Sequence, residues 1–207
     1  MTTTRVPYAE AARTLLRDSL LDAARDLLAD RSWSQVTMAG VAKGAGVSRQ
    51  TLYNEFGSRQ EFAQAFVLRE TDRFLSAVET AVEANLDDPT RAVSAALGVF
   101  LSAAADNPLV RAVLADDGDE LLPLVTTHGG PVIAFATARL AATFHAGWPH
   151  VAVAKAELLA ECVVRLAISF AVLPQGPAGI TPDSVAELLG PFIRDAVAEG
   201  DSGAAAA

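Results

Sequence analysis

The residues best suited to chemistry lie in one short polar segment near the N-terminal end of the chain. Its hydrogen-bonding side chains are those of Ser48, Arg49, Gln50, Thr51, Tyr53 and Asn54. A helix here would bury only Leu52 and, at its end, Phe56, which is too little apolar surface to explain the helix by packing. Arginine and amide side chains can bond to base edges of DNA, and hydroxyl groups can bond to phosphates. The segment therefore predicts a surface that enters a major groove.

A second short helix is expected just before this segment. Thr37 is suited to cap a helix over 38–45, and the glycines at 44 and 46 permit a tight turn after it. Ser48 would then cap the polar helix over 49–55. Two short helices joined by a glycine-containing turn are typical of a helix-turn-helix.

The rest of the chain also predicts helices. Ser58 and Glu61 form a capping box that opens a long helix, and later helix starts are marked by a capping residue followed by proline, as at Asp88–Pro89 and Thr181–Pro182. Helices are expected over 8–30, 38–45, 49–55, 59–85, 90–105, 107–115, 119–146 (bent near Gly129–Pro131), 149–173 and 182–199, with a loop over 174–180. The expected fold class is all-α, with about nine helices.

The distribution of charge favours contact with phosphates at one end. The formal net charge is −9, but residues 1–60 carry eight basic and six acidic side chains, whereas residues 61–207 carry eight and nineteen. A mildly basic N-terminal unit on an acidic body fits a protein that presents one end to DNA.

The composition also predicts the cellular compartment of the protein and excludes some kinds of site. One cysteine, Cys162, excludes an internal disulfide framework and a multi-cysteine zinc site. Residues 1–10 show no signal-peptide pattern, and Lys155, Glu157, Glu161 and Arg165 interrupt the apolar segment 151–173. A cytoplasmic protein without membrane contact, metal or cofactor is expected.

The run TMAGVAKGAGVSRQTLYNEFGSRQEF, residues 37–62, resembles the DNA-binding signature of the TetR family of bacterial repressors. The matching elements are a threonine at the start of the second helix, an Ala-Gly-Val-Ser turn, a Thr-Leu-Tyr core and the Phe, cap, basic and acidic residues that follow. The body is also similar to actinobacterial members associated with fatty-acid or alkane metabolism. The resemblance implies a ligand-responsive repressor that binds a palindromic operator in double-stranded DNA as a homodimer.

The resemblance also implies domains and contacts. The domains would be a helix-turn-helix unit over 1–57 and an effector-binding and dimerisation body over 58–200 with 58–85 as connecting helix. The small residues over 201–207 predict a disordered tail. Phosphate contacts would come from Thr37, Ser48, Tyr53 and Arg59, and base or phosphate contacts from Arg49, Gln50, Thr51 and Asn54.

Glu55 departs from the family pattern, because many relatives carry a histidine or another DNA-compatible residue there. A carboxylate that faces phosphates is repelled, so Glu55 either points away, accepts a hydrogen bond from a cytosine amine, or pairs with Arg59.

The C-terminal body predicts an interface and a pocket. The last two helices have wide apolar faces, which would pair with their twofold mates through Leu159, Val163, Leu188 and Phe192. An apolar pocket for a fatty acid, acyl compound or similar effector is expected among the following residues, with His128 or Arg165 as alternatives for a polar head group. Its predicted lining is Phe74, Val78, Leu97, Phe100, Val110, Leu114, Leu122, Val125, Ile133, Leu140, Phe144, Leu166 and Phe170, together with Val93.

Two other function classes remain open on the sequence. A constitutive DNA-binding regulator without an effector would lack a ligand-dependent loss of operator binding. A helical enzyme has little chemical support, because His128, His145 and His150 show no metal-ligand spacing and Cys162 lies on an apolar helix face.

Overall fold

Most of the expected helices are present, and three predicted capping residues act as expected. The computed structural model describes residues 7–106, 108–114, 120–172 and 181–204, which contain helices and no strand. Thr37, Ser48 and Ser58 each accept a backbone hydrogen bond at the start of a helix, from Gly40, Thr51 and Glu61. The helices are α1 (Tyr8–Asp30), the short 3-10 helix η1 (Trp33–Gln35), α2 (Met38–Gly44), α3 (Arg49–Phe56), α4 (Arg59–Glu83), α5 (Pro89–Asp106), α6 (Pro108–Leu114), α7 (Leu122–Val125), α8 (Gly130–Gly147), α9 (Val153–Val172) and α10 (Pro182–Ala204).

One expected helix is divided in two. The prediction for 119–146 is a single bent helix, whereas the structure has α7 and α8 separated by Thr126–Gly129. A Cβ on Gly129 would lie 2.8 Å from the carbonyl of Val125, so only glycine allows the chain to turn back so closely on the end of α7. Pro131 follows in the first turn of α8, where its missing N–H is tolerated.

The C-terminal helix is longer than expected. Helix α10 runs to Ala204, so it includes four residues of the tail predicted to be disordered, and only 205–207 lie outside the described residues. Helix propensity alone does not explain this extension, because residues 201–204 are Asp, Ser, Gly and a single Ala. The predicted loop over 174–180 also lies outside the described residues.

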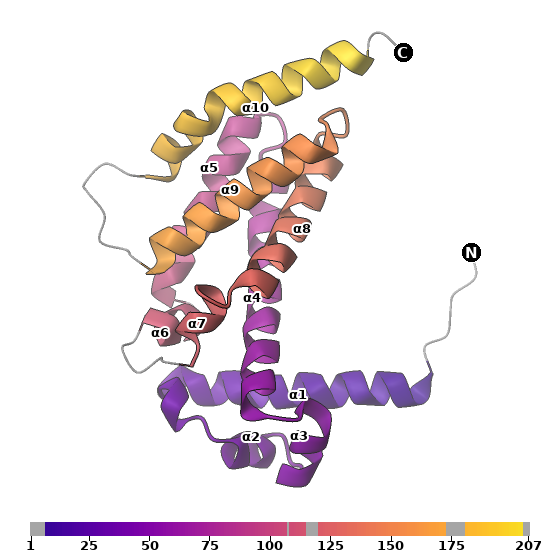
Figure 1. Ribbon diagram of the computed structural model, residues 1–207, viewed down its shortest axis with the longest axis vertical. Coiled ribbons are helices and arrows are strands. Elements are labelled where there is room, and N and C mark those ends of the chain that lie inside the picture. The colour runs from indigo at the N-terminus through magenta and orange to yellow at the C-terminus, as the bar shows by residue number, and fades with distance from the viewer. Residues whose placement is uncertain (1–6, 107, 115–119, 173–180, 205–207) are drawn as a thin grey trace.

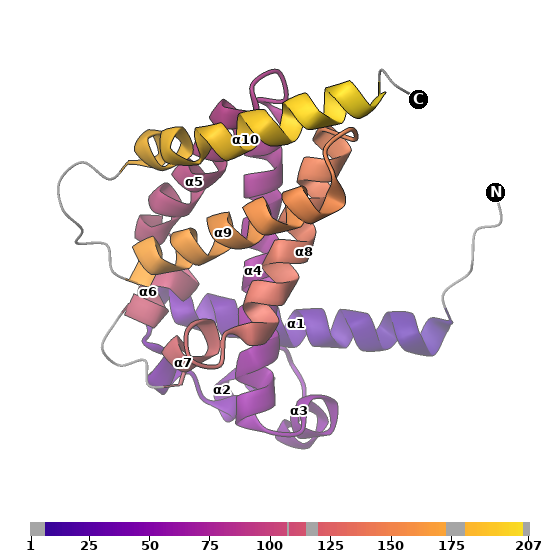
Figure 2. The same cartoon turned by 45° about the horizontal axis from the view of Figure 1, so that its top comes forward.

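Helix α4 connects the two ends of the molecule. Helices α1, α2 and α3 form the lower end in Figure 1, and α4 rises from them into a bundle with α5, α8 and α9. Helix α10 packs on α5, while α6 and α7 lie beside the lower part of α4 (Figures 1 and 2). Among the described residues no helix is long and apolar enough to cross a membrane.

Two hydrophobic cores lie along α4. The first joins α1, α2, α3 and the first half of α4, up to Val67, and it also includes Leu109 and Val113 of α6, Leu121 and Val132. The second begins at Leu75 and joins the rest of α4 to α5, α8, α9 and α10. Helices α6 and α7 therefore pack with the N-terminal helices rather than only with the body.

Candidate DNA-binding surface and effector cavity

Helix α3 presents its polar side chains outward, as the sequence predicts. Leu52 and Phe56 are its buried residues, while Arg49, Gln50 and Asn54 are exposed. The side-chain amide of Gln50 donates to Asn54 Oδ1 at 2.8 Å, and the hydroxyl groups of Ser48 and Thr51 are 2.8 Å apart. These bonds lie along one exposed side of the helix, where the same groups are available to a partner.

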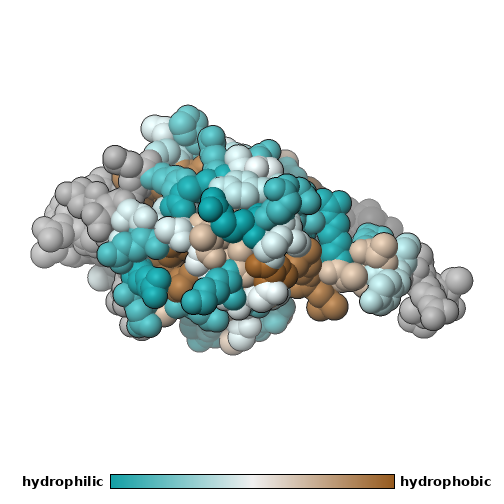
Figure 3. All heavy atoms as spheres, turned by 90° about the horizontal axis from the view of Figure 1, so that it is seen from below, coloured by the Kyte–Doolittle hydropathy of each residue, from teal (hydrophilic) through white to brown (hydrophobic). Residues whose placement is uncertain are grey.

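The lower end of the molecule is predominantly hydrophilic. Figure 3 views this end, and polar side chains cover most of it around smaller apolar patches. Thr37, Ser48 and Lys43 are exposed here, whereas Tyr53 is half-buried and packs against the first core. Lys43, at the end of α2, is a cation that the sequence reasoning did not single out.

Glu55 points away from the exposed side of α3. Its carboxylate accepts hydrogen bonds from Arg13 Nε at 3.0 Å and from an Arg17 terminal nitrogen at 2.7 Å, both in α1. The Arg17 guanidinium also lies over the Phe56 ring, 4.4 Å from its centroid. Of the three alternatives for Glu55, orientation away from the DNA-facing surface describes this structure, and pairing with Arg59 is wrong.

The two arginines change the titration of Glu55. Burial of the carboxylate raises its pKa, but the hydrogen bonds from Arg17 and Arg13 and their positive charges outweigh this effect, so the pKa is lowered. The ionised carboxylate of Glu55 therefore links α3 to α1 through its contacts with the two arginines.

Arg59 is not free to hold a phosphate in this structure. Its guanidinium donates to the backbone oxygens of Trp33 and Val36 and to the carboxylate of Glu120, with Nε to Oε2 at 2.9 Å. The phosphate contact of Arg59 stays a prediction, and in this structure the guanidinium is engaged by Glu120, which is 61 positions later in the chain and lies against the start of α4.

Glu120 joins the N-terminal helices to the segment that precedes α7. The Trp33 indole N–H donates to its Oε2 at 2.7 Å, next to the bond from Arg59. Trp33 in turn stacks on Phe66 with ring centroids 5.2 Å apart. Leu121, directly after Glu120, is fully buried in the first core. The contact of Glu120 with Trp33 is therefore held by buried packing of Trp33 on one side and of Leu121 on the other.

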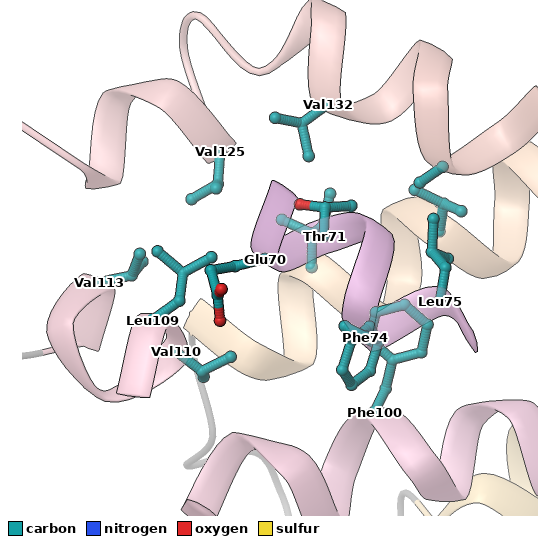
Figure 4. A pocket seen from close by; sticks show the side chains of 13 residues that line it. Glu70, Thr71, Phe74, Leu75, Phe100, Leu109, Val110, Val113, Val125 and Val132 are labelled. Carbon is teal, nitrogen blue, oxygen red and sulfur yellow. The ribbon is translucent and has the colours of Figure 1, made fainter. Parts of the chain in front are cut away.

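A cavity of about 100 Å³ lies between the two cores (Figure 4). Four of the fourteen predicted pocket residues line it: Phe74, Phe100, Val110 and Val125. Its other lining residues are Glu70, Thr71, Leu75, Leu109, Val113, Val132, Ala136, Val164 and Ile168. The walls come from α4, α5, α6, α7, α8 and α9. A ligand in the cavity would therefore contact residues of both cores.

Most of the other predicted lining residues have packing roles. Val78, Val93, Leu97, Leu140 and Phe144 are buried in the second core. Ile133, Leu166 and Phe170 pack at its margin, and Leu122 packs on the first core. The side chain of Leu114 lies outside the described residues. His128 and Arg165 are exposed and do not line this cavity, and Arg165 pairs with Glu161, so neither is placed to contact a ligand in it.

Glu70 is the charged residue that the sequence reasoning missed at this cavity. It is the only charged side chain among the described lining residues, and its side chain is 1% exposed. The sequence could have predicted its burial. Glu70 follows Val67 by three residues and precedes Phe74 by four, which places it on the apolar side of α4.

The predicted interface residues differ in their placement. Leu188 of α10 is 78% exposed, and Leu159 and Phe192 are half-buried. Val163 is fully buried in the second core of its own protomer, so it offers no surface to another chain, because α9 turns this side chain toward the bundle.

Two family models match the chain over most of its length. The model described as bacterial regulatory proteins of the tetR family matches residues 20–66, and the bacterial tetracyclin repressor C-terminal domain matches residues 88–191. The HTH-type transcriptional regulator AlkX of Mycobacterium tuberculosis is 42% identical over 91% of this chain and 90% of its own length. The chain belongs to the TetR family.

Solved structures of TetR-family proteins are similar throughout this fold. The TetR-family repressor AlkX from a Dietzia strain, implicated in biodegradation of n-alkanes, has a TM-score of 0.75 at 36% identity, covering 87% of this chain and 96% of that one. A TetR-family regulator from Streptomyces coelicolor shares the fold, with a TM-score of 0.53 at 22% identity over 96% and 99% of the two chains. This chain is accordingly a TetR-family transcriptional regulator.

The ion pairs of Glu55 with Arg13 and Arg17 predict that the stability of this TetR-family protein depends on pH. Because the folded-state pKa is lowered, the stabilisation is present above the unfolded value of about 4.3 and is lost as pH falls through the folded value. Glu55→Gln should lower the free energy of unfolding by about 1 kcal/mol at pH 7. Urea denaturation of both proteins at a series of pH values measures the difference, which should shrink below about pH 4.3.

Asp87→Asn is the matched control for this experiment, because it removes an exposed ion pair with Arg91 outside the two helices of the C-terminal end. Its effect on stability at pH 7 should be much smaller than that of Glu55→Gln. A Glu55 effect that persists undiminished to pH 3 would show that the charge of Glu55 does not support the contact with α1.

Proposed function

We propose that this protein is a ligand-responsive transcriptional repressor that binds an operator as a homodimer and releases it when an apolar effector enters the cavity. The observation that carries the proposal is the outward polar side of α3, held by Ser48 at its start and by Leu52 and Phe56 on its buried side. A helix of this kind is suited to a major groove, and the free N–H groups at its start favour a phosphate.

Each exposed side chain of α3 has a chemical role in this proposal. Arg49 suits guanine or a neighbouring phosphate, while Gln50 and Asn54 suit adenine or a bridging contact. Thr37, Ser48, Thr51 and Tyr53 supply hydroxyl groups for phosphates. Arg59 is engaged with Glu120 in this structure, so it contributes to DNA only if that contact opens.

Substitutions on α3 should weaken operator binding without unfolding the protein. A footprint on the DNA upstream of its own gene locates the operator, and fluorescence anisotropy then measures affinity. Tyr53→Phe, Thr51→Ala and Arg49→Ala should each weaken binding by about 5- to 150-fold, since each removes one contact worth about 1–3 kcal/mol. If Arg49 contacts a phosphate, its substitution also reduces the salt dependence by about one counterion.

Arg91→Ala is the matched control, because it removes an exposed arginine that pairs with Asp87 at the start of α5. Helix α5 begins near the end of α4 that is remote from α3 (Figure 1). Its operator affinity should equal that of the unchanged protein. Unchanged affinity in all three α3 variants would contradict this docking surface.

Helices α9 and α10 are the proposed dimer surface. Three of the six large hydrophobic side chains exposed in the described residues lie on them, namely Val153, Leu158 and Leu188. Such a concentration of exposed apolar groups on two neighbouring helices favours burial against a twofold mate. Leu159 and Phe192 lie beside this surface, whereas Val163 is excluded by its burial.

The proposed interface predicts that Leu188→Glu shifts the protein toward monomers. A buried carboxylate on each side of a twofold contact is costly, so the dimer dissociation constant should rise at least about tenfold. Sedimentation analysis measures the change. Leu15→Glu is the control, because Leu15 is also 70% exposed but lies on α1. An equal effect of both variants would exclude α10 as the interface.

An aliphatic effector fits the cavity. Its lining is apolar except for Glu70 and Thr71, and the related Dietzia repressor is implicated in n-alkane biodegradation. A volume of about 100 Å³ holds a small ligand only, so a longer chain must separate the two cores that meet there. A ligand that prefers the separated state shifts the protein toward it, which distinguishes this proposal from constitutive DNA binding.

A further inference from the structure

A single buried carboxylate faces the apolar cavity. Glu70 comes from the part of α4 that lies between the two cores, and its oxygens point toward Leu109 and Val110 of α6 (Figure 4). The other polar side chain in the wall, Thr71, donates its hydroxyl to the backbone oxygen of Val67 at 2.8 Å. Glu70 is therefore the polar group most available to a ligand.

Two arginines hold the carboxylate from the side of α1 and α4. Arg73 donates to Oε1 at 3.1 Å, and Arg25 lies with its Nε 3.5 Å from Oε2. Each oxygen thus has one basic neighbour, while a carboxylate has about four acceptor positions in total. Acceptor capacity remains on Glu70 for a donor that approaches from the cavity.

The charges around Glu70 balance. Arg73 also pairs with Asp22, and Arg69 pairs with Asp22 at 2.9 Å and with Asp18 at 2.7 Å. The connected group therefore contains three arginines and three acids. An ionic head group of either sign would add an uncompensated charge beside the buried Glu70, which is costly, whereas a neutral donor adds none.

We propose that Glu70 selects an effector with a neutral hydrogen-bond donor at its end, namely a primary aliphatic alcohol. Its hydroxyl donates to the Glu70 carboxylate, and its first carbons lie among Phe74, Phe100, Leu109 and Val110. This selection disfavours the ionised carboxylate of a fatty acid. The inference rests on the proposed function, because it specifies the effector of the same cavity.

The test compares ligands that share one chain length. Isothermal titration calorimetry measures the binding of octane, 1-octanol, octanoate and octylammonium to the full-length protein. 1-Octanol should bind at least about tenfold more tightly than octane, because a hydrogen bond to a charged group contributes about 1.5–3 kcal/mol. Octanoate and octylammonium should both bind less tightly than 1-octanol.

A single substitution should change this order. Glu70→Gln leaves the connected group with one excess positive charge, so octanoate should gain affinity relative to 1-octanol while octane is little affected. Thr71→Val is the matched control, since it removes the other lining hydroxyl and should preserve the order of the wild-type protein. Thermal unfolding identifies any variant that does not fold. If Glu70→Gln does not fold, the order of ligand affinities of the wild-type protein tests the role of Glu70 by itself.

The outcomes separate this inference from the proposed function. Three results would overturn the role of Glu70: octanoate as the tightest ligand of the wild-type protein, equal affinities for octane and 1-octanol, or an unchanged order in folded Glu70→Gln. None of these results would contradict an apolar effector. Binding of none of the four ligands, with operator binding intact, would contradict the effector part of the proposed function as well.

Discussion

The structure depends on one helix that is shared by two hydrophobic cores. Helix α4 contributes to the N-terminal core as far as Val67 and to the body from Leu75 onward, with Glu70 buried between them. An unpaired carboxylate at that position would cost several kcal/mol. Its contact with Arg25 joins α4 to α1, and Arg73, on α4 itself, pairs with both Glu70 and Asp22 of α1. The same junction contains the cavity, which places a ligand where the two cores meet.

A second connection runs beside α4. Glu120 accepts hydrogen bonds from Trp33 and Arg59, and the nearby helix α7 contributes Val125 to the cavity wall. Movement of α7 to admit a longer ligand would therefore act on the segment between α1 and α2 and on the start of α4. The first connection continues along α1, whose Arg13 and Arg17 bind Glu55 of α3, and the second reaches the start of α4, which packs on α3. We propose these contacts as routes of coupling between the cavity and α3.

Local chemistry determined how much could be predicted from the sequence. Caps such as Thr37 and Ser48, and the polar exposed side of α3, depend on neighbouring residues, so they were predicted with their positions. The contacts of Arg59 with Glu120 and of Glu55 with Arg13 join residues 61 and 42 positions apart, and pattern alone does not identify such partners. For the same reason the apolar residues that line the cavity could not be separated from those that fill the cores.

Coupling between the cavity and the DNA-binding surface is tested most directly by a linkage measurement. The affinity for 1-octanol is measured with and without saturating operator DNA, and the operator affinity is measured with and without saturating 1-octanol. If the cavity and α3 are coupled as described, operator DNA weakens ligand binding by the same factor by which the ligand weakens operator binding, typically about 5- to 150-fold. Equal ligand affinity for the free and the operator-bound protein would contradict the coupling.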